Sequence, residues 1–86
     1  MSWKIYIIET EDNTYYTGIT TNIERRLAEH FNRKKGAKYF SISKPKRLVY
    51  VEEVQNRSLA TKREIQIKKL SKKEKTKLIN NHLLHF

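Results

Sequence analysis

The chain has 86 residues, which is the length of one domain with a core too small to enclose a large cavity. Its 19 Lys and Arg outnumber its 9 Asp and Glu, and the formal net charge at pH 7 is +10. The absence of cysteine excludes disulfides and thiolate metal sites. We therefore expect a single domain spanning 1–86, with any site on its surface or in a shallow groove.

The first residues, MSWKIYII, hold one lysine and no long apolar run. They resemble neither a signal peptide nor a membrane-spanning segment. We therefore expect a cytoplasmic protein that has no membrane partner.

The first part of the chain predicts a β-hairpin followed by a helix. Residues 3–9 and 14–19 are rich in β-branched and aromatic types, and the short polar link between them contains turn formers. A helix then begins either at Thr21, as a capping box, or at Asn22, and it ends near residue 32. Its apolar side chains recur at i, i+4 and i+8, at Ile23, Leu27 and Phe31.

The second half of the chain predicts one strand and two helices. Residues 47–54 form the strand, and Ser58 is the expected cap of the helix that follows. A capping box of Ser71 and Glu74 begins the last helix, which ends near His82. Apolar core candidates on these helices are Leu59, Ala60, Ile67, Leu70, Leu78 and Ile79. The resulting order, ββαβαα, predicts an α+β fold in which helices pack over a three-stranded sheet.

The positive charge falls in two blocks. The segment 33–47 carries seven cations and no acid, and the segment 61–86 carries eight cations and two acids. Such blocks attract polyanions, of which nucleic acid is the most common in a cell, although a solvated face kept for solubility is the alternative. The candidate nucleic-acid contacts are Arg25, Arg33, Lys34, Lys35, Lys38, Lys44, Lys46, Arg47, Lys68 and Lys69.

Two tyrosines, an arginine and a histidine are expected to meet near the N-terminus. Tyr6 and Tyr16 lie on the two paired strands, while Arg26 and His30 share one helix face at i and i+4. Phosphodiester cleavage needs a base for water and a cation that stabilises the developing negative charge. From the residue types alone, each side chain also fits a structural role in a strand or on a helix surface.

Glu64 is a carboxylate among cations on the second predicted helix. A hard divalent cation prefers oxygen ligands, so Glu64 is a candidate metal ligand. Its structural alternative is an i,i+4 ion pair with Lys68.

The chain resembles the GIY-YIG nuclease superfamily, and most closely its small single-domain bacterial members. The family's Gly-Ile-Tyr corresponds to KIY at residues 4–6, and its Tyr-Ile-Gly corresponds to YTG at residues 16–18. The segment TGITTNIERRLAEH is similar to the helix that carries the family's arginine and histidine, and KREIQIKKL is similar to the segment that carries its glutamate. Lys4 replaces the first glycine, and Ile19 stands where some members have a lysine.

The resemblance implies metal-dependent hydrolysis of DNA by a three-stranded antiparallel sheet flanked by helices. In that scheme Glu64 would hold Mg²⁺ or Mn²⁺, and Arg26 would bind the scissile phosphate. Tyr6 and Tyr16 would orient or activate water, with Tyr16 preferred as the base, and His30 would assist or contact phosphate.

The resemblance also implies DNA as the partner, with RNA left open, and a role in DNA repair. Larger members attach a module that finds the DNA site, so we expect structure-directed selectivity or a targeting protein partner. Two alternatives stay open: a non-catalytic nucleic-acid-binding module of the same fold, and a protein-interaction domain whose charge serves solubility.

Overall fold

The computed structural model describes residues 2–32 and 38–82, which form three strands and four helices. In chain order these are β1 (Trp3–Thr10), β2 (Tyr15–Thr20), α1 (Ile23–Asn32), α2 (Tyr39–Ile42), β3 (Pro45–Val54), α3 (Arg57–Lys69) and α4 (Lys72–His82). The strands pair antiparallel in the order β2-β1-β3. The α+β class and the order ββαβαα are therefore confirmed, with α2 added as a single turn between α1 and β3.

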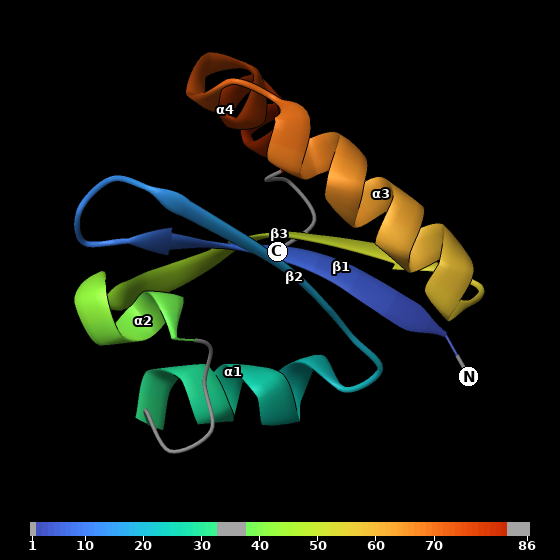
Figure 1. Cartoon of the computed structure of the whole chain (residues 1–86), viewed down its shortest axis with the longest axis horizontal. Coiled ribbons are helices and arrows are strands. Elements are labelled where there is room, and N and C mark those ends of the chain that lie inside the picture. The colour runs from blue at the N-terminus through green and yellow to red at the C-terminus, as the bar shows by residue number, and fades with distance from the viewer. Residues whose placement is uncertain (1, 33–37, 83–86) are drawn as a thin grey trace.

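The sheet is covered on both faces. Figure 1 shows α1 and α2 on one side of it and α3 and α4 on the other. Successive side chains of a strand point to opposite faces, so the central strand β1 supplies both cores. Ile5 and Ile7 pack with the α3 and α4 side, and Tyr6 and Ile8 pack with the α1 and α2 side. All four side chains are buried, which explains the unbroken apolar run in the sequence.

The buried face of α1 differs by one residue from the face that the sequence predicts. On α1, Ile23 and Leu27 pack in the core as predicted, but Phe31 is 42% exposed and His30 is fully buried. The positions i, i+4 and i+7 stay closer to one line on a helix of 3.6 residues per turn than i, i+4 and i+8 do, so His30 takes the place expected for Phe31.

On α3, Ala60 and Ile67 are buried as expected. Leu59 is 42% exposed, so its prediction as a core residue was wrong. It lies about 100° around the helix from Ala60, away from the buried line. On α4, Ile79 is buried and Leu78 packs against the same core.

The cap of α3 also differs from the sequence prediction. Asn56, in an extended conformation, accepts a hydrogen bond through Oδ1 from the backbone N–H of Leu59 at 2.9 Å. Ser58 lies inside the helix, because the chain turns out of β3 only two residues before the helix begins. Asn56, and not Ser58, therefore satisfies the free N–H groups at this helix start.

The starts of α1 and α4 agree with the sequence. Asn22 Oδ1 accepts from the backbone N–H of Arg25 at 3.0 Å, which decides between the two expected caps of α1. In the capping box of α4, the Glu74 N–H donates to Ser71 Oγ at 3.1 Å, and the Ser71 N–H donates to Glu74 Oε1 at 2.8 Å. In the described part of the chain, no helix is long and apolar enough to cross a membrane.

Asn56 and Ser58, at the start of α3, allow a matched test of the cap assignment. We expect Asn56→Ala to lower the free energy of unfolding by roughly 0.5–2 kcal/mol, because it removes the cap. Ser58→Ala should change it by less than about 0.5 kcal/mol, since Ser58 is exposed within the helix. Urea unfolding followed by circular dichroism measures both, and equal losses in the two variants would contradict the cap assignment.

Candidate active site

Tyr6 and His30 form a buried pair that joins the sheet to α1. Tyr6 projects from the central strand β1 toward α1, and the last turn of α1 carries His30 back over it. Their Oη and Nε2 atoms are 2.8 Å apart, and the two residues are 1% and 0% exposed. This hydrogen bond satisfies two polar atoms that would otherwise be buried alone.

Tyr16 adds a third ring from the edge strand β2. Its ring centroid lies 6.2 Å from that of Tyr6 and 5.5 Å from that of His30. Tyr16 is half-buried, whereas the other two rings are enclosed. The phenol of Tyr16 is therefore the one of the two that solvent and a substrate reach more easily.

Gly18 makes room for the Tyr6 ring. The register pairs Tyr6 with Gly18, so the Tyr6 side chain passes across β2 at this position. A Cβ atom at residue 18 would lie 2.5 Å from Tyr6 Oη and 2.7 Å from Tyr6 Cζ. Only glycine leaves this space open, because the bond to His30 holds the ring in place.

Burial sets the protonation of the pair. Burial and, after it, the positive charge of Arg26 together lower the pKa of His30 to about 4, with Glu29 opposing both. Burial likewise raises the pKa of Tyr6, with a contribution from Tyr16 that Arg26 opposes. At neutral pH both groups are uncharged. With the imidazole proton on Nδ1, His30 Nε2 accepts the hydrogen bond from the Tyr6 hydroxyl.

Arg26 places a guanidinium beside the rings. Its Nη1 donates to Glu29 Oε1 at 2.9 Å, three residues along the same helix. Burial acts to lower the pKa of Arg26, but hydrogen bonds to Glu29 and Tyr6 outweigh it and raise the pKa. The arginine is thus charged, half-buried and oriented, which suits a group that binds a phosphate oxygen.

The structure therefore brings Tyr6, Tyr16, Arg26 and His30 together, as the sequence predicted. Their catalytic roles stay a prediction. Sequence reasoning missed the acidic partner Glu29, although its i,i+3 spacing from Arg26 was a readable signal.

Two aromatic residues of α2 close one side of this cluster and were also missed. Phe40 is buried, with its ring centroid 4.8 Å from that of Tyr16 and 4.7 Å from that of His30. Tyr39 lies 5.5 Å from Tyr16, measured between ring centroids. The sequence signal for them is the aromatic pair Tyr39-Phe40 inside the basic segment 33–47.

Glu64 lies on α3, which covers the opposite face of the sheet from α1 (Figure 1). Its carboxylate is 20% exposed and lies 3.3 Å from Lys68 Nζ, so the ion pair expected as the structural alternative is present. Within residues 2–32 and 38–82, no three His, Asp or Glu side chains gather as a metal cluster. A single carboxylate still fits Mg²⁺, which keeps several waters and binds proteins through one or two carboxylates together with substrate phosphates.

The candidate nucleic-acid contacts divide into two groups. Arg33, Lys34 and Lys35 lie outside the described residues. The others are exposed: Arg25, Lys38, Lys44, Lys46, Arg47, Lys68 and Lys69. Arg47 Nε pairs with Glu9 Oε1 at 2.7 Å. Arg47 and Lys68 are thus already paired with carboxylates of the protein itself, which reduces the charge that they offer to a nucleic acid.

A family model described as the GIY-YIG catalytic domain matches residues 2–78. The chain belongs to the GIY-YIG family. Members of this family are generally endonucleases, and GIY-YIG nucleases act on DNA.

Similar relatives include two UPF0213 proteins. That of Syntrophus aciditrophicus is 50% identical over 91% of this chain and 90% of the relative. That of Desulfotalea psychrophila is 49% identical over 91% of this chain and 71% of the relative. The solution NMR structure of a UPF0213 protein from Bacillus halodurans is 36% identical, with a TM-score of 0.59, over 93% of this chain and 84% of that one.

The geometry explains how this GIY-YIG domain departs from the family motifs. Lys4, which replaces the first glycine, is half-buried and pairs with Glu53 Oε2 at 3.4 Å, so the position accommodates a long side chain. Ile19 packs into the core on the α3 side. It therefore points away from the tyrosine rings, and Arg26 is the cation that accompanies them.

The close approach at Gly18 generates a stability prediction. Gly18→Ala should displace Tyr6 and lower the free energy of unfolding by roughly 1–3 kcal/mol, the usual cost of overpacking. The neighbouring Thr17→Val is the control. Among the residues that the structure describes, the buried Thr17 hydroxyl has no hydrogen-bond partner, so its loss should not destabilise the protein. Chemical denaturation measures both, and an alanine variant as stable as the parent would contradict the proposed clash.

The neutral state of His30 generates a pH prediction. Its folded pKa of about 4 lies below the usual 6.5, so its contribution to stability is complete above pH 6.5. That contribution is lost as the pH falls from 6.5 toward 4, because the unfolded state then binds the proton more readily. We expect the melting temperature to fall more steeply over this range in the parent than in His30→Gln. Parallel pH profiles would show that His30 does not titrate differently in the two states.

Proposed function

We propose that the protein is a divalent-metal-dependent endonuclease that hydrolyses phosphodiester bonds in DNA. The observation that carries this proposal is the Tyr6–His30 hydrogen bond of 2.8 Å, with Tyr16 and the charged Arg26 beside it. This combination offers a phenol near solvent and a fixed cation in one place. Membership of the GIY-YIG family supports the same activity.

In the proposed reaction, a water molecule attacks phosphorus and the bond to the leaving oxygen breaks. Arg26 binds a non-bridging oxygen and stabilises the negative charge of the transition state. Its bond to Glu29 orients the guanidinium before the substrate arrives.

Tyr16 is the side chain that we favour to accept the proton from water, after its phenol has lost its own proton to solvent. Tyr6 is a poorer base, because its hydroxyl is bonded to His30 and burial raises its pKa. Tyr6 and the neutral His30 then hold the aromatic cluster in position through their hydrogen bond.

Glu64 is the residue that would hold Mg²⁺ or Mn²⁺. The metal would supply charge neutralisation and polarisation of phosphate oxygens when bound. In the ion pair with Lys68 the Glu64 carboxylate already binds one cation.

A cleavage assay tests this proposal. Labelled single-stranded, duplex, flapped and four-way DNA are incubated with the protein in Mg²⁺, in Mn²⁺ or in EDTA. We expect cutting that needs a metal and falls by roughly 10²–10³-fold in Arg26→Ala, the usual effect of losing one charge-stabilising donor. Tyr16→Phe should lose at least about 10²-fold, since it keeps the ring but removes the general base. Glu64→Gln should raise the metal concentration needed for cutting.

Matched controls are available on the same elements. Arg57→Ala removes an exposed arginine at the start of α3. This arginine lies over the Trp3 ring on the α3 face of the sheet and not on the α1 face. Glu24→Gln neutralises an exposed carboxylate at the start of α1. Both controls should cut like the parent. Cutting that persists in EDTA, or in Arg26→Ala, would contradict the proposal, and salt-sensitive binding without cutting would identify a binding module of the same fold.

A further inference from the structure

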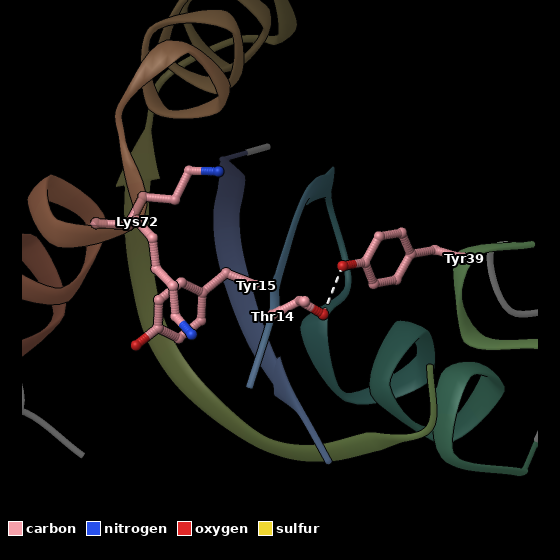
Figure 2. A pocket seen from close by; sticks show the side chains of 5 residues that line it. Thr14, Tyr15, Tyr39 and Lys72 are labelled. Carbon is pink, nitrogen blue, oxygen red and sulfur yellow. Dashed lines mark hydrogen bonds between the residues drawn. The ribbon is translucent and has the colours of Figure 1, made fainter. Parts of the chain in front are cut away.

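A shallow groove of about 260 Å³ lies beside the candidate active site. Its lining residues, drawn in Figure 2, are Thr14, Tyr15, Tyr39, Lys72 and Lys75. They come from the start of β2, from α2 and from the beginning of α4, which are far apart in the sequence. The groove thus combines two aromatic rings with two cations, and none of these five residues was among the predicted site residues.

The two tyrosine rings of the groove are held by their hydroxyl groups. Tyr39 donates to Thr14 Oγ1 at 2.6 Å, and Figure 2 shows the ring pointing at that threonine. Tyr15 Oη lies 3.1 Å from Thr76 Oγ1 on α4. Each ring is fixed at its tip and partly exposed along its side, with Tyr39 38% exposed. Rings held in this way bind a flat partner without a large entropic cost.

The two lysines of the groove are available for an anion. Among the residues that the structure describes, neither Lys72 nor Lys75 forms an ion pair with a carboxylate. The carboxylate closest to them in sequence, Glu74, is engaged by the backbone N–H of Ser71. At i and i+3, the lysines point to the same side of α4. Their charge therefore faces the groove without an acidic partner.

Fixed aromatic rings next to unpaired cations match the chemistry of a single-stranded nucleic acid. Bases of a single strand stack on aromatic side chains while phosphates contact lysine and arginine, whereas a duplex keeps its bases stacked on one another. The groove is smaller than the roughly 300–1,000 Å³ typical of pockets for drug-sized ligands, so it suits one nucleotide at a time.

The groove is continuous with the candidate active site through the aromatic cluster. The Tyr39 ring contacts Tyr16 at a centroid distance of 5.5 Å, and Tyr16 contacts His30 at the same distance. The groove therefore adjoins the cluster that would act on phosphate, because the Tyr39 ring of the groove contacts the Tyr16 ring of the cluster. A strand lying across the cluster would place a neighbouring nucleotide in the groove.

We propose that this groove binds an unpaired nucleotide next to the scissile phosphate, so that the substrate is a single-stranded or flapped nucleic acid. The base would lie against Tyr39 or Tyr15, and its phosphates would contact Lys72 and Lys75. The inference rests on the proposed nuclease function and names the class of substrate for it.

A binding experiment with matched lysine pairs tests the cationic half of the groove. Fluorescence anisotropy in EDTA measures the affinity for a labelled oligothymidine and for a labelled duplex. The double variant Lys72→Ala/Lys75→Ala should bind oligothymidine more weakly and reduce the salt slope by about 1.4, for two phosphates lost from a single strand. The control Lys73→Ala/Lys77→Ala removes the same charge from exposed positions on α4 outside the groove. Equal losses in both doubles would overturn the proposal.

Substitutions of Tyr39 test the aromatic half. Tyr39→Leu should weaken oligothymidine binding by about 5- to 150-fold, the effect of losing one stacked base, and leave duplex affinity unchanged. Tyr39→Phe keeps the ring and should bind nearly as the parent does. Circular dichroism confirms that each variant is folded. Equal losses for oligothymidine and duplex in Tyr39→Leu, or no loss for either, would overturn the proposal.

The binding and cleavage measurements can refute the groove proposal and the nuclease proposal separately. A parent protein that prefers oligothymidine through these residues but cuts nothing would refute the nuclease proposal and leave the groove intact. A parent protein that cuts DNA, but whose groove variants bind single strands normally, would refute the groove alone.

Discussion

The hydrogen bond between Tyr6 and His30 is the contact on which the α1 face of the molecule depends. It joins the central strand to the last turn of α1, and it requires the open space over Gly18. It also fixes two polar groups in a core where neither would be stable alone. The positions of Tyr16, Phe40 and Arg26 follow from it, because each packs against one member of this pair.

The two faces of the sheet bury different kinds of side chain. The face toward α3 and α4 is an apolar core built on Ile5, Ile7, Ala60, Ile67 and Ile79. The face toward α1 and α2 holds the aromatic and polar side chains that could act on a phosphate. A chain of this length has little apolar surface to bury. The core of the α1 and α2 face also contains aliphatic residues such as Ile8 and Leu27, and the polar Tyr6 and His30 share that core because they are bonded to each other.

The sequence predicted the elements better than it predicted their rotation and their ends. Strand-forming residue types and capping residues are local signals, and they located all three strands and the capping box of α4. The burial of His30 in place of Phe31 depends on the Tyr6 hydroxyl, which is 24 residues away in the chain. The convergence of Tyr6, Tyr16 and Arg26 followed from strand pairing and helix spacing. The groove required α2 and α4 to meet β2 from both sides, and no local pattern encodes that.

Because the sheet is covered on both faces, the two cores share little besides the backbones of its three strands. Substitutions on the aromatic face leave the aliphatic packing of the other face in place. Such a fold can lose or replace its chemistry over evolutionary time while remaining folded. Descendants of one ancestral nuclease could thus keep the same architecture and come to serve as binding domains, and family membership alone would not distinguish them from active enzymes.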